Sequence, residues 1–387
     1  ALLAAAGAFA VGRVFGLVEL YVLCAGLVTA ALIALIAVWR PIPNLVVRRI
    51  VHPALVSVGE SARVDLQVTN VDGRRSPHLV LWEPVGTEGG APMQIAALRP
   101  GEAADAAYRV PTARRGLLVA GPLRASRRDV LGLCVKSATL IGTEEVLVVP
   151  QHIHLPFPTI GSAGRLGQHL RLRAWGQTGG EFHSLREYAA GDDLRRINWK
   201  ASARSQDLMV RETALEGLQR CTVVLDTERG AFDPSPGTEA FERAVSVAAS
   251  VTMSASTAGI GTRLVSAGID LRGPDVAANG LRWLATVEPS NEPMNYASLA
   301  RGVHEGLGVV VLVTGSARSG AVTSARAGIS PEDTLVVVTV NTGATADGTS
   351  DGDGGASRGR FVVDASSVDM LERSWTALVS GRNPVPV

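Results

Sequence analysis

The sequence predicts a multidomain chain with an apolar helical hairpin at its N-terminus, a small antiparallel β-sandwich and a doubly wound α/β domain. Three observations predict this order: an uncharged apolar run near the start, short alternating strands after it, and apolar strands alternating with amphipathic helices from Leu218 onward. A run of about 20 apolar residues spans the hydrocarbon core of a bilayer. Alternating strands and helices are typical of a parallel sheet with helices on its faces.

Residues 1–40 are predicted to form a transmembrane hairpin. Leu20–Trp39 carries no charged residue, whereas Ala1–Val11 is apolar but too short to cross a bilayer. Because the sequence starts with Ala, we expect a first transmembrane helix whose beginning precedes it. The alternative is a signal peptide, whose apolar core would be shorter and would end at a small-residue cleavage site.

Basic residues predict the orientation of this hairpin. Arg40, Arg48 and Arg49 follow the second apolar run, whereas Arg13 alone lies between the two helices. Short segments rich in Lys and Arg remain on the cytoplasmic side of a membrane. We therefore expect a protein of the inner (plasma) membrane that contacts the lipid bilayer and keeps its soluble domains in the cytoplasm.

Residues 45–150 are predicted to form the β-sandwich. Val64, Leu66 and Val68 alternate with polar residues, which is the period of a half-buried strand. Turn signals separate the short strands, and no helix of useful length fits between them. Residues 151–217 are then predicted to form a linker rich in Pro, Gly and Arg, followed by a charged segment.

The charged segment runs from Glu181 to Glu212 and is the densest run of charge in the chain. It holds six acidic and six basic residues, interleaved with apolar and aromatic side chains. A disordered tail would lack the aromatic residues. We therefore predict a packed element, with Trp199 buried against the α/β domain.

A helix is predicted over Leu194–Ala203, with Asp192 or Asp193 as its N-cap. Basic side chains then recur every four residues along it, at Arg196, Lys200 and Arg204. Like charges at this spacing repel one another. Two interpretations stay open: an internal salt-bridge network that holds the segment on the next domain, or a docking surface for an acidic partner.

Residues 218–387 are predicted to form the doubly wound α/β domain. Cys221–Leu225 and Val309–Val313 are continuous apolar runs, as expected of strands covered on both faces. Asp226 directly follows the first of these strands. Since ligands of such sheets bind at the carboxyl ends of the strands, Asp226 is the best single candidate for a site. The low-complexity stretch 341–359 is predicted to be a disordered loop.

The string LREYAAGDDLRRINWKASAR resembles the signature of the domain of unknown function 58 family. The matching positions are Arg186, Glu187, Tyr188, Gly191, Asp192, Arg196, Ile197, Trp199, Ala203 and Arg204. VSVGESARVDLQVTN and RRDVLGL in the β-sandwich resemble the same family. The resemblance implies a bacterial, membrane-anchored protein whose partner is a MoxR-type AAA+ ATPase. The expected partner-binding residues are Arg186, Glu187, Tyr188, Asp192, Arg196, Trp199, Lys200 and Arg204.

The α/β domain also resembles a von Willebrand factor A-type domain. That fold binds a divalent cation through the pattern D-x-S-x-S together with a distant Thr and a distant Asp. In this sequence Asp226 keeps the first position, but Glu228 and Gly230 replace the two Ser residues, and no Asp adjoins Thr314. We therefore expect a degenerate metal site at Asp226 and no cofactor, or at most weak Mg²⁺ or Ca²⁺.

The predicted function is that of a cytoplasm-facing scaffold or adaptor, not an enzyme. It would work with the AAA+ ATPase in the assembly or maturation of an envelope complex. The sequence contains none of the common phosphate-binding, zinc-protease or serine-hydrolase motifs. The alternative is a carboxylate-based metal-dependent hydrolase, in which clustered carboxylates hold metal ions; its candidates are Glu181, Asp192, Asp193 and Asp226.

Nucleic-acid binding is a third and weaker interpretation. It would use the basic residues Arg195, Arg196, Lys200 and Arg204. The net charge is only +1 and aromatic residues make up 4% of the chain, so neither a strong electrostatic field nor a base-stacking surface is expected. We therefore predict no nucleic-acid partner.

Overall fold

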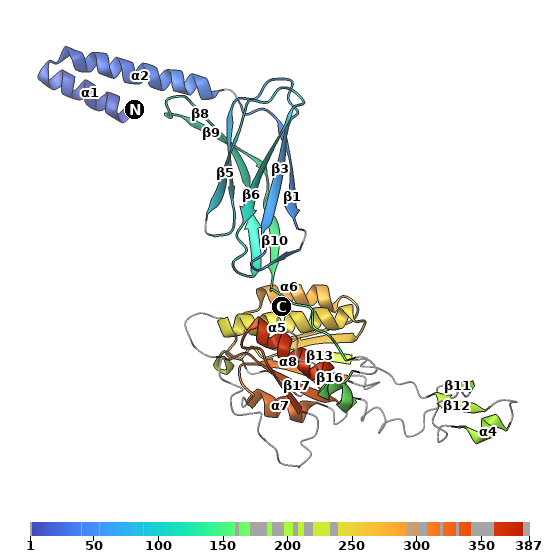
Figure 1. Ribbon diagram of the computed structural model, residues 1–387. Coiled ribbons are helices and arrows are strands. Elements are labelled where there is room, and N and C mark those ends of the chain that lie inside the picture. The colour runs from blue at the N-terminus through green and yellow to red at the C-terminus, as the bar shows by residue number, and fades with distance from the viewer. Residues whose placement is uncertain are drawn as a thin grey trace. The chain divides into compact units, whose positions relative to one another are not determined.

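The computed structural model describes residues 2–39, 41–53, 55–87, 89–158, 162–170, 184–187, 197–203, 208–212, 220–232, 239–292, 294, 296, 299, 308–317, 320–329, 333–341 and 360–381. The chain divides into two compact units, Ala1–Val149 and Pro150–Val387. Figure 1 shows the helices and strands of both units. The units are described one at a time below.

Two apolar helices, α1 (Leu2–Phe15) and α2 (Val18–Trp39), begin the first unit. They pack through small and aromatic residues, and the rings of Phe9 and Tyr21 meet edge to face at 5.6 Å. α2 has 22 residues and is long and apolar enough to cross a membrane, while only 11% of its most apolar window is buried. A core helix of a soluble protein would be mostly buried, so this exposure favours an N-terminal membrane anchor.

The rest of the first unit is rich in strands. They are β1 (Leu45–His52), β2 (Val56–Ser57), β3 (Ala62–Asn70), β4 (Leu79–Pro84), β5 (Gly90–Ile95), β6 (Ala103–Val110), β7 (Gly116–Ala120), β8 (Leu123–Arg128), β9 (Val135–Ile141) and β10 (Glu144–Val149). Antiparallel sheets run in the orders β1-β3-β6 and β5-β4-β8-β9, and β2, β10 and β7 form a third sheet.

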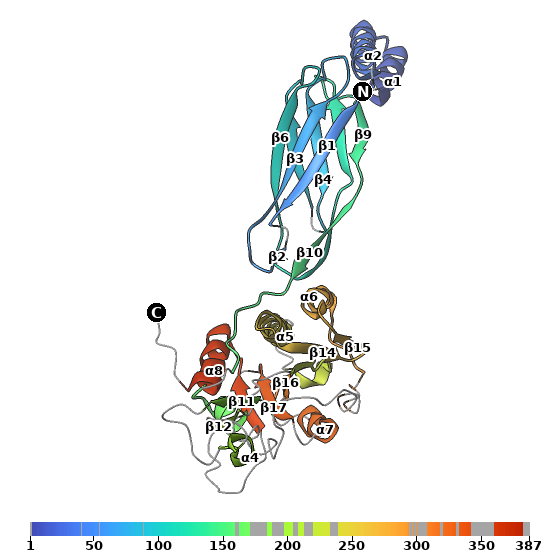
Figure 2. The same cartoon turned by 90° about the vertical axis from the view of Figure 1, so that its right-hand side faces the viewer.

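One apolar core joins these sheets. Leu66 of β3 and Leu81 of β4 belong to the same cluster of buried side chains as Leu123 of β8. β3 alternates between buried and more exposed positions along its whole length, which confirms the alternation seen in the sequence. Figure 2 shows the strands of this region from the side.

A buried ion-pair network lies beside this core. The Arg49 side chain is 2% exposed and pairs with Glu83, which is fully buried, and with Glu144 at 3.2 Å. Burial, and then the charge of Glu83, raise the pKa of the neighbouring Tyr108. From the sequence, Arg49 was expected among the charges that flank the membrane helix. In the folded chain its side chain is instead buried beside the core of the β region.

The second unit contains an α/β sheet. Its elements are β13 (Arg220–Leu225), α5 (Glu239–Thr257), β14 (Gly261–Ser266), β15 (Ile269–Arg272), α6 (Val276–Thr286), β16 (Gly308–Thr314), α7 (Gly320–Gly328), β17 (Thr334–Thr339), β18 (Arg360–Asp364) and α8 (Val368–Ser380). The strand order is β15-β14-β13-β16-β17-β18, and every neighbouring pair except β14–β15 is parallel.

Helices cover both faces of this sheet. Figures 1 and 2 show α5 and α6 on one face and α7 on the other. β16 and β17 are therefore buried at every position, as their continuous apolar sequences predicted. The prediction of an α/β sheet with parallel strands is confirmed.

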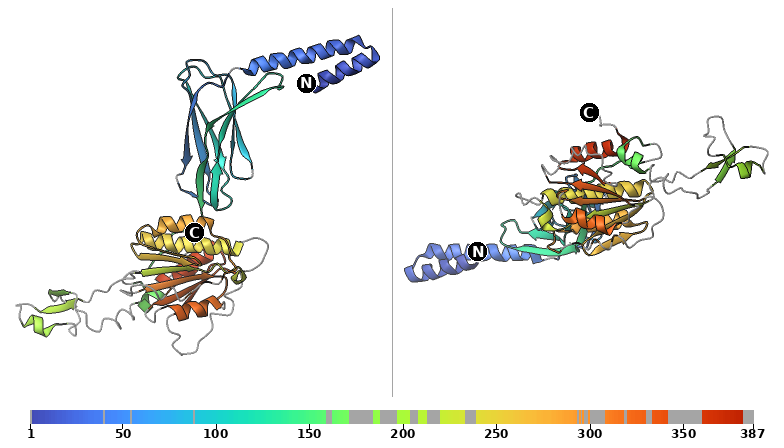
Figure 3. Two further views of the ribbon diagram at one scale, coloured as in Figure 1. Left: turned by 180° about the vertical axis from the view of Figure 1, so that it is seen from behind. Right: turned by 90° about the horizontal axis from the view of Figure 1, so that it is seen from below.

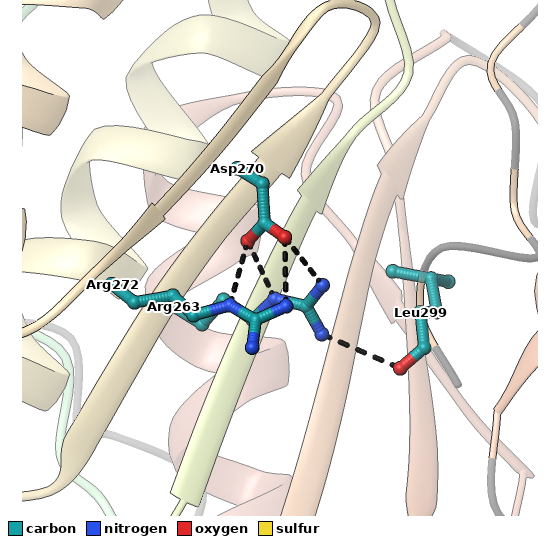
Figure 4. A network of polar contacts seen from close by, with 4 residues as sticks. All are labelled: Arg263, Asp270, Arg272 and Leu299. Atoms are coloured by element: carbon teal, nitrogen blue, oxygen red, sulfur yellow. Dashed lines mark hydrogen bonds and ion pairs between the residues drawn. The ribbon is translucent and has the colours of Figure 1, made fainter. Parts of the chain in front are cut away.

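The antiparallel edge strand β15 was not predicted from the sequence. The antiparallel pairing of β14 with β15 places Arg263 of β14 directly opposite Arg272 of β15. Like charges in that position destabilise a strand pair. The carboxylate of Asp270 accepts hydrogen bonds from Arg263 Nε at 2.7 Å and Arg272 Nη2 at 2.8 Å (Figure 4). The hydrogen bond from Arg263 is the main reason that the pKa of Asp270 is lowered. Asp270 thus offsets the repulsion at this sheet edge.

Residues 151–158 pack onto the α/β unit. The N–H of Ile153 donates to Ser250 Oγ at 3.0 Å, and the N–H of Leu155 donates to Ser254 Oγ at 2.9 Å. Leu155 is fully buried. The beginning of the predicted linker is thus held along α5, because serine hydroxyls on that helix accept its backbone N–H groups.

The charged segment contains a small sheet and one helical turn among its described residues. β11 (Ser184–Glu187) pairs antiparallel with β12 (Met209–Glu212), and α4 spans Trp199–Ser202. The side chain of Asn198 caps α4 by accepting the N–H of Ala201. The helix predicted over Leu194–Ala203 is wrong at Ile197 and Asn198, which are not helical, and α4 begins only at Trp199; the predicted start at Leu194 lies outside the described residues. The predicted caps Asp192 and Asp193 lie outside the described residues, as does the predicted loop beyond Asn341.

Candidate functional site

The topological switch point of the sheet lies between β13 and β16. From β13 the chain continues to β14 on one side, and it later returns across β13 to form β16 on the other side. In open α/β sheets, ligands bind beyond the carboxyl ends of strands at such a point. Asp226 and Thr227 follow β13 there, and Thr314 ends β16. The structure therefore brings Asp226 and Thr314 together, although 88 positions separate them in the sequence.

Both carboxylate oxygens of Asp226 are already hydrogen-bonded. Thr314 Oγ1 donates to Asp226 Oδ2 at 2.8 Å, and the N–H of Glu228 donates to Asp226 Oδ1 at 3.0 Å. The backbone N–H of Asp226 donates to the carbonyl of Val313 at 2.9 Å, which extends the pairing of the two strands. The carboxylate is thereby held in one orientation.

Burial is the main influence on the charge of this group. It raises the pKa of Asp226, while the hydrogen bonds from Glu228 and Thr314 oppose the rise. Burial also raises the pKa of Tyr296, with further contributions from the negative charges of Asp226 and Glu228. Tyr296 is therefore a neighbour of the carboxylates of Asp226 and Glu228. Sequence reasoning missed it, because its segment has no motif or periodicity that points to the site.

The loop after β13 closes tightly over the end of β16. A side chain at Gly315 would place its Cβ 1.7 Å from the carbonyl oxygen of Ala231. Only glycine allows the two backbones to approach so closely. The hydroxyl of Thr227 is buried in this loop without a hydrogen-bond partner among the described residues. Thr227 is a second site residue that the sequence analysis missed.

The donor set at this site does not fit a tightly held divalent cation. Mg²⁺ and Ca²⁺ require several oxygen ligands, usually including more than one carboxylate. Asp226 is committed to Thr314 and to a backbone N–H, Glu228 is the one further carboxylate near it among the described residues, and Gly230 offers no side-chain oxygen. The described part of the chain contains no group of three or more His, Cys, Asp or Glu residues that could hold a metal ion.

We therefore predict that Mg²⁺, Ca²⁺ and Mn²⁺ bind no tighter than about the millimolar range of weak sites. Titration calorimetry of the purified chain is the measurement, with Asp226→Asn as the control that keeps the side-chain shape. Micromolar binding that disappears in Asp226→Asn would show that the site holds a cation after all.

Trp199 is exposed, contrary to the burial predicted from the sequence. Its side chain is 68% exposed, and Lys200 beside it is exposed as well, whereas Ile197 is buried. α4 is tied to β12 by the N–H of Asn198, which donates to the carbonyl of Met209 at 2.8 Å.

The other predicted partner-binding residues fall into two groups. Arg186 and Glu187 lie on β11, opposite Val210 and Met209 of β12. The remaining four, Tyr188, Asp192, Arg196 and Arg204, lie outside the described residues. Glu181 and Asp193, which the hydrolase alternative requires, also lie outside them.

One protein-family model matches the part of the sequence that forms the small sheet, α4 and most of the α/β sheet. Residues 184–340 match the family "Protein of unknown function DUF58". This match supports a DUF58 family protein. It covers β11, α4 and the strands from β12 to β17, and so includes both Trp199 and Asp226. A search of curated proteins found no match.

Some solved structures are similar to part of the chain. One is the CARDB domain of a Pyrococcus furiosus protein in complex with di-metal ions, at 18% identity and a TM-score of 0.22, over 28% of this chain and 94% of that one. Another is the putative ApaA protein from Bordetella pertussis, at 10% identity and a TM-score of 0.20, over 28% of this chain and 98% of that one. Similarities at this level carry no functional conclusion for this chain.

Proposed function

We propose that this chain is a membrane-anchored adaptor that binds a protein partner through the DUF58 segment around Trp199. The observation that carries the proposal is the exposure of Trp199 next to the exposed Lys200. Trp residues are usually well buried in a folded chain. At protein interfaces, exposed Trp residues supply a disproportionate share of the binding energy.

The membrane helix supports the anchoring half of this proposal. α2 is long enough to span a bilayer, and its apolar side chains are largely uncovered. We propose that the soluble units face the cytoplasm at the inner membrane, as the basic residues after α2 suggest. We further propose, on the resemblance of the α/β unit, a von Willebrand A-like domain that has kept the fold while its cation site has degenerated.

The resemblance to the DUF58 family suggests the class of partner. We propose a MoxR-type AAA+ ATPase, with the adaptor presenting it to an envelope complex during assembly or maturation. A basic and aromatic docking surface suits a partner surface with acidic side chains, because opposite charges steer the encounter of two proteins.

Binding to a purified MoxR-type ATPase tests the proposal. The full chain is placed in nanodiscs, and the affinity is measured for the natural chain and for Trp199→Ala. We expect the variant to bind about 30-fold more weakly, since an interfacial hot-spot residue contributes about 2 kcal/mol or more. Its melting temperature should stay within a few degrees, because an exposed side chain packs little.

Trp82→Ala is the matched control. Trp82 is also an exposed Trp, but it lies on β4 in the other unit, so its removal should leave the affinity unchanged. Equal affinity of Trp199→Ala and the natural chain would refute this docking surface. Metal-dependent hydrolysis by the purified chain, lost in Asp226→Asn, would favour the hydrolase alternative over the adaptor.

A further inference from the structure

The turn between β8 and β9, residues 129–134, presents an exposed apolar tip. Val130 is fully exposed, Leu131 is 61% exposed, and Leu133 is exposed as well. Apolar side chains gathered on one exposed surface usually mark a site of interaction with a protein or a membrane. Figures 1 and 3 show this hairpin reaching beyond the rest of the β region on the side where α2 joins it.

Asp129 holds the tip in a fixed shape. Its carboxylate accepts the N–H of Leu131 at 2.9 Å and the N–H of Cys134 at 2.6 Å. Its own carbonyl accepts the N–H of Gly132, and its N–H donates to the carbonyl of Cys134. Because these backbone groups are already paired, the tip can enter a water-poor environment without leaving them unsatisfied.

Lys136 connects this hairpin to the end of the apolar helix. Its Nζ donates to the carbonyl oxygen of Trp39 at 3.0 Å, and Trp39 is the last residue of α2. A Trp at the end of a membrane-crossing helix is typical of the membrane–water interface. One strand residue, Val135, separates Lys136 from the tip. The tip therefore starts close to the level at which α2 leaves the bilayer.

Basic side chains flank the tip. Arg127 of β8 lies directly opposite Lys136 of β9, and the exposed Arg128 follows it. Like charges directly opposite one another destabilise a strand pair. The side chain of Arg127 makes no hydrogen bond or ion pair with any residue in the described part of the chain. An anion bound between Arg127 and Lys136 would offset their repulsion.

We propose that the β8–β9 hairpin docks on the membrane surface. The apolar side chains of its tip enter the boundary between headgroups and acyl chains, and Arg127, Arg128 and Lys136 bind the phosphates of anionic lipids. Apolar residues beside basic ones are the combination that binds an anionic membrane interface. The hairpin is then a second membrane contact that limits the motion of the β region. The inference depends on anchoring by α2 and not on any protein partner.

Lipid quenching of a label at the tip tests this docking. The full chain carries Cys134→Ser and Leu131→Cys, is labelled with the fluorophore NBD, and is placed in nanodiscs of phosphatidylcholine with or without phosphatidylglycerol. Cys221 is fully buried in the α/β unit, so the label does not reach that thiol. The same protein without Leu131→Cys measures any labelling of Cys24.

Spin-labelled lipids should quench the label at position 131 severalfold more than a label at Leu55→Cys. Leu55 is an exposed residue that follows β1, at the end of that strand far from α2, and it carries the control label. Val130→Cys serves as a second tip position, in case Leu131→Cys disturbs the turn. Quenching at both tip positions is expected to rise when phosphatidylglycerol is present.

The basic residues account for that rise. Arg127→Gln combined with Arg128→Gln should reduce the quenching to the value seen in phosphatidylcholine alone. Arg124→Gln is the matched control, because Arg124 is exposed on the same strand but lies opposite Thr139 and not opposite a cation. It should leave the effect of phosphatidylglycerol unchanged.

Three outcomes would overturn the inference. An unquenched tip label, in nanodiscs that carry the chain, refutes the hairpin contact and leaves the anchor and the adaptor function standing. If the NBD emission shifts to the blue without quenching, and the shift grows with protein concentration, the tip contacts a second copy of the chain and not the membrane. A chain that does not co-elute with nanodiscs at all refutes the anchor, and the hairpin contact with it.

Discussion

Trp375→Ala should lower the free energy of unfolding of the α/β unit by about 3–5 kcal/mol, the range for removing a large buried aromatic side chain. Trp375 lies on α8 and is among the largest fully buried side chains. Its ring meets that of Phe157 edge to face at 5.7 Å, and its Nε1–H donates to the carbonyl oxygen of Pro156 at 2.7 Å. The substitution therefore opens a cavity and also releases residues 151–158 from α8.

Urea unfolding of the full chain in detergent, followed by near-ultraviolet circular dichroism, measures this effect. Trp375→Phe is the control, because it keeps most of the apolar volume but leaves the Pro156 carbonyl without its donor. A buried group that loses its partner costs about 1–3 kcal/mol, so this variant should fall between the natural chain and Trp375→Ala. Equal stability of Trp375→Ala and Trp375→Phe would show that the cavity contributes little.

Glu83→Ala should destabilise the β region by about 3–5 kcal/mol, as expected when one partner of a buried ion pair is removed. The Arg49 side chain is 2% exposed, and its remaining carboxylate partner, Glu144, is 47% exposed. A guanidinium stays charged under all folding conditions. Without Glu83, Arg49 must therefore remain charged in a dry site with only one partly solvated partner. Calorimetric melting of the full chain in detergent measures the loss.

The double variant Arg49→Met with Glu83→Leu shows whether the loss of stability in Glu83→Ala comes from the unpaired charge of Arg49 or from the lost packing of the pair. Replacing a whole buried ion pair by apolar residues of similar size is often neutral or stabilising, by about 1–4 kcal/mol. The double variant should therefore melt at a higher temperature than Glu83→Ala. If it melts at or below the temperature of Glu83→Ala, the site depends on the ion pair itself and not on the absence of an uncompensated charge.

The position of Asp226 could be predicted, but its neighbours could not. A continuous apolar run that ends in a single carboxylate marks the carboxyl end of a buried strand, and the structure has Asp226 there. Thr227 is the next residue after Asp226, but Tyr296 reaches the same place only because the chain crosses over at the switch point. That crossing depends on the order of strands in the sheet, and no local pattern in the sequence specifies it.

The sequence by itself determined the features that depend on neighbouring residues. The apolar length of α2, the alternation along β3 and the unbroken apolar run of β16 each follow from local composition and period. Tertiary structure alone decided the burial of three side chains that residue type and local period do not predict. The Arg49 side chain is 2% exposed and Trp199 lies in solvent, the opposite of what their residue types suggest. Trp375 is buried against a segment 219 positions away. Burial of one side chain depends on the distant element that packs on it, and periodicity within a few residues carries no information about that element.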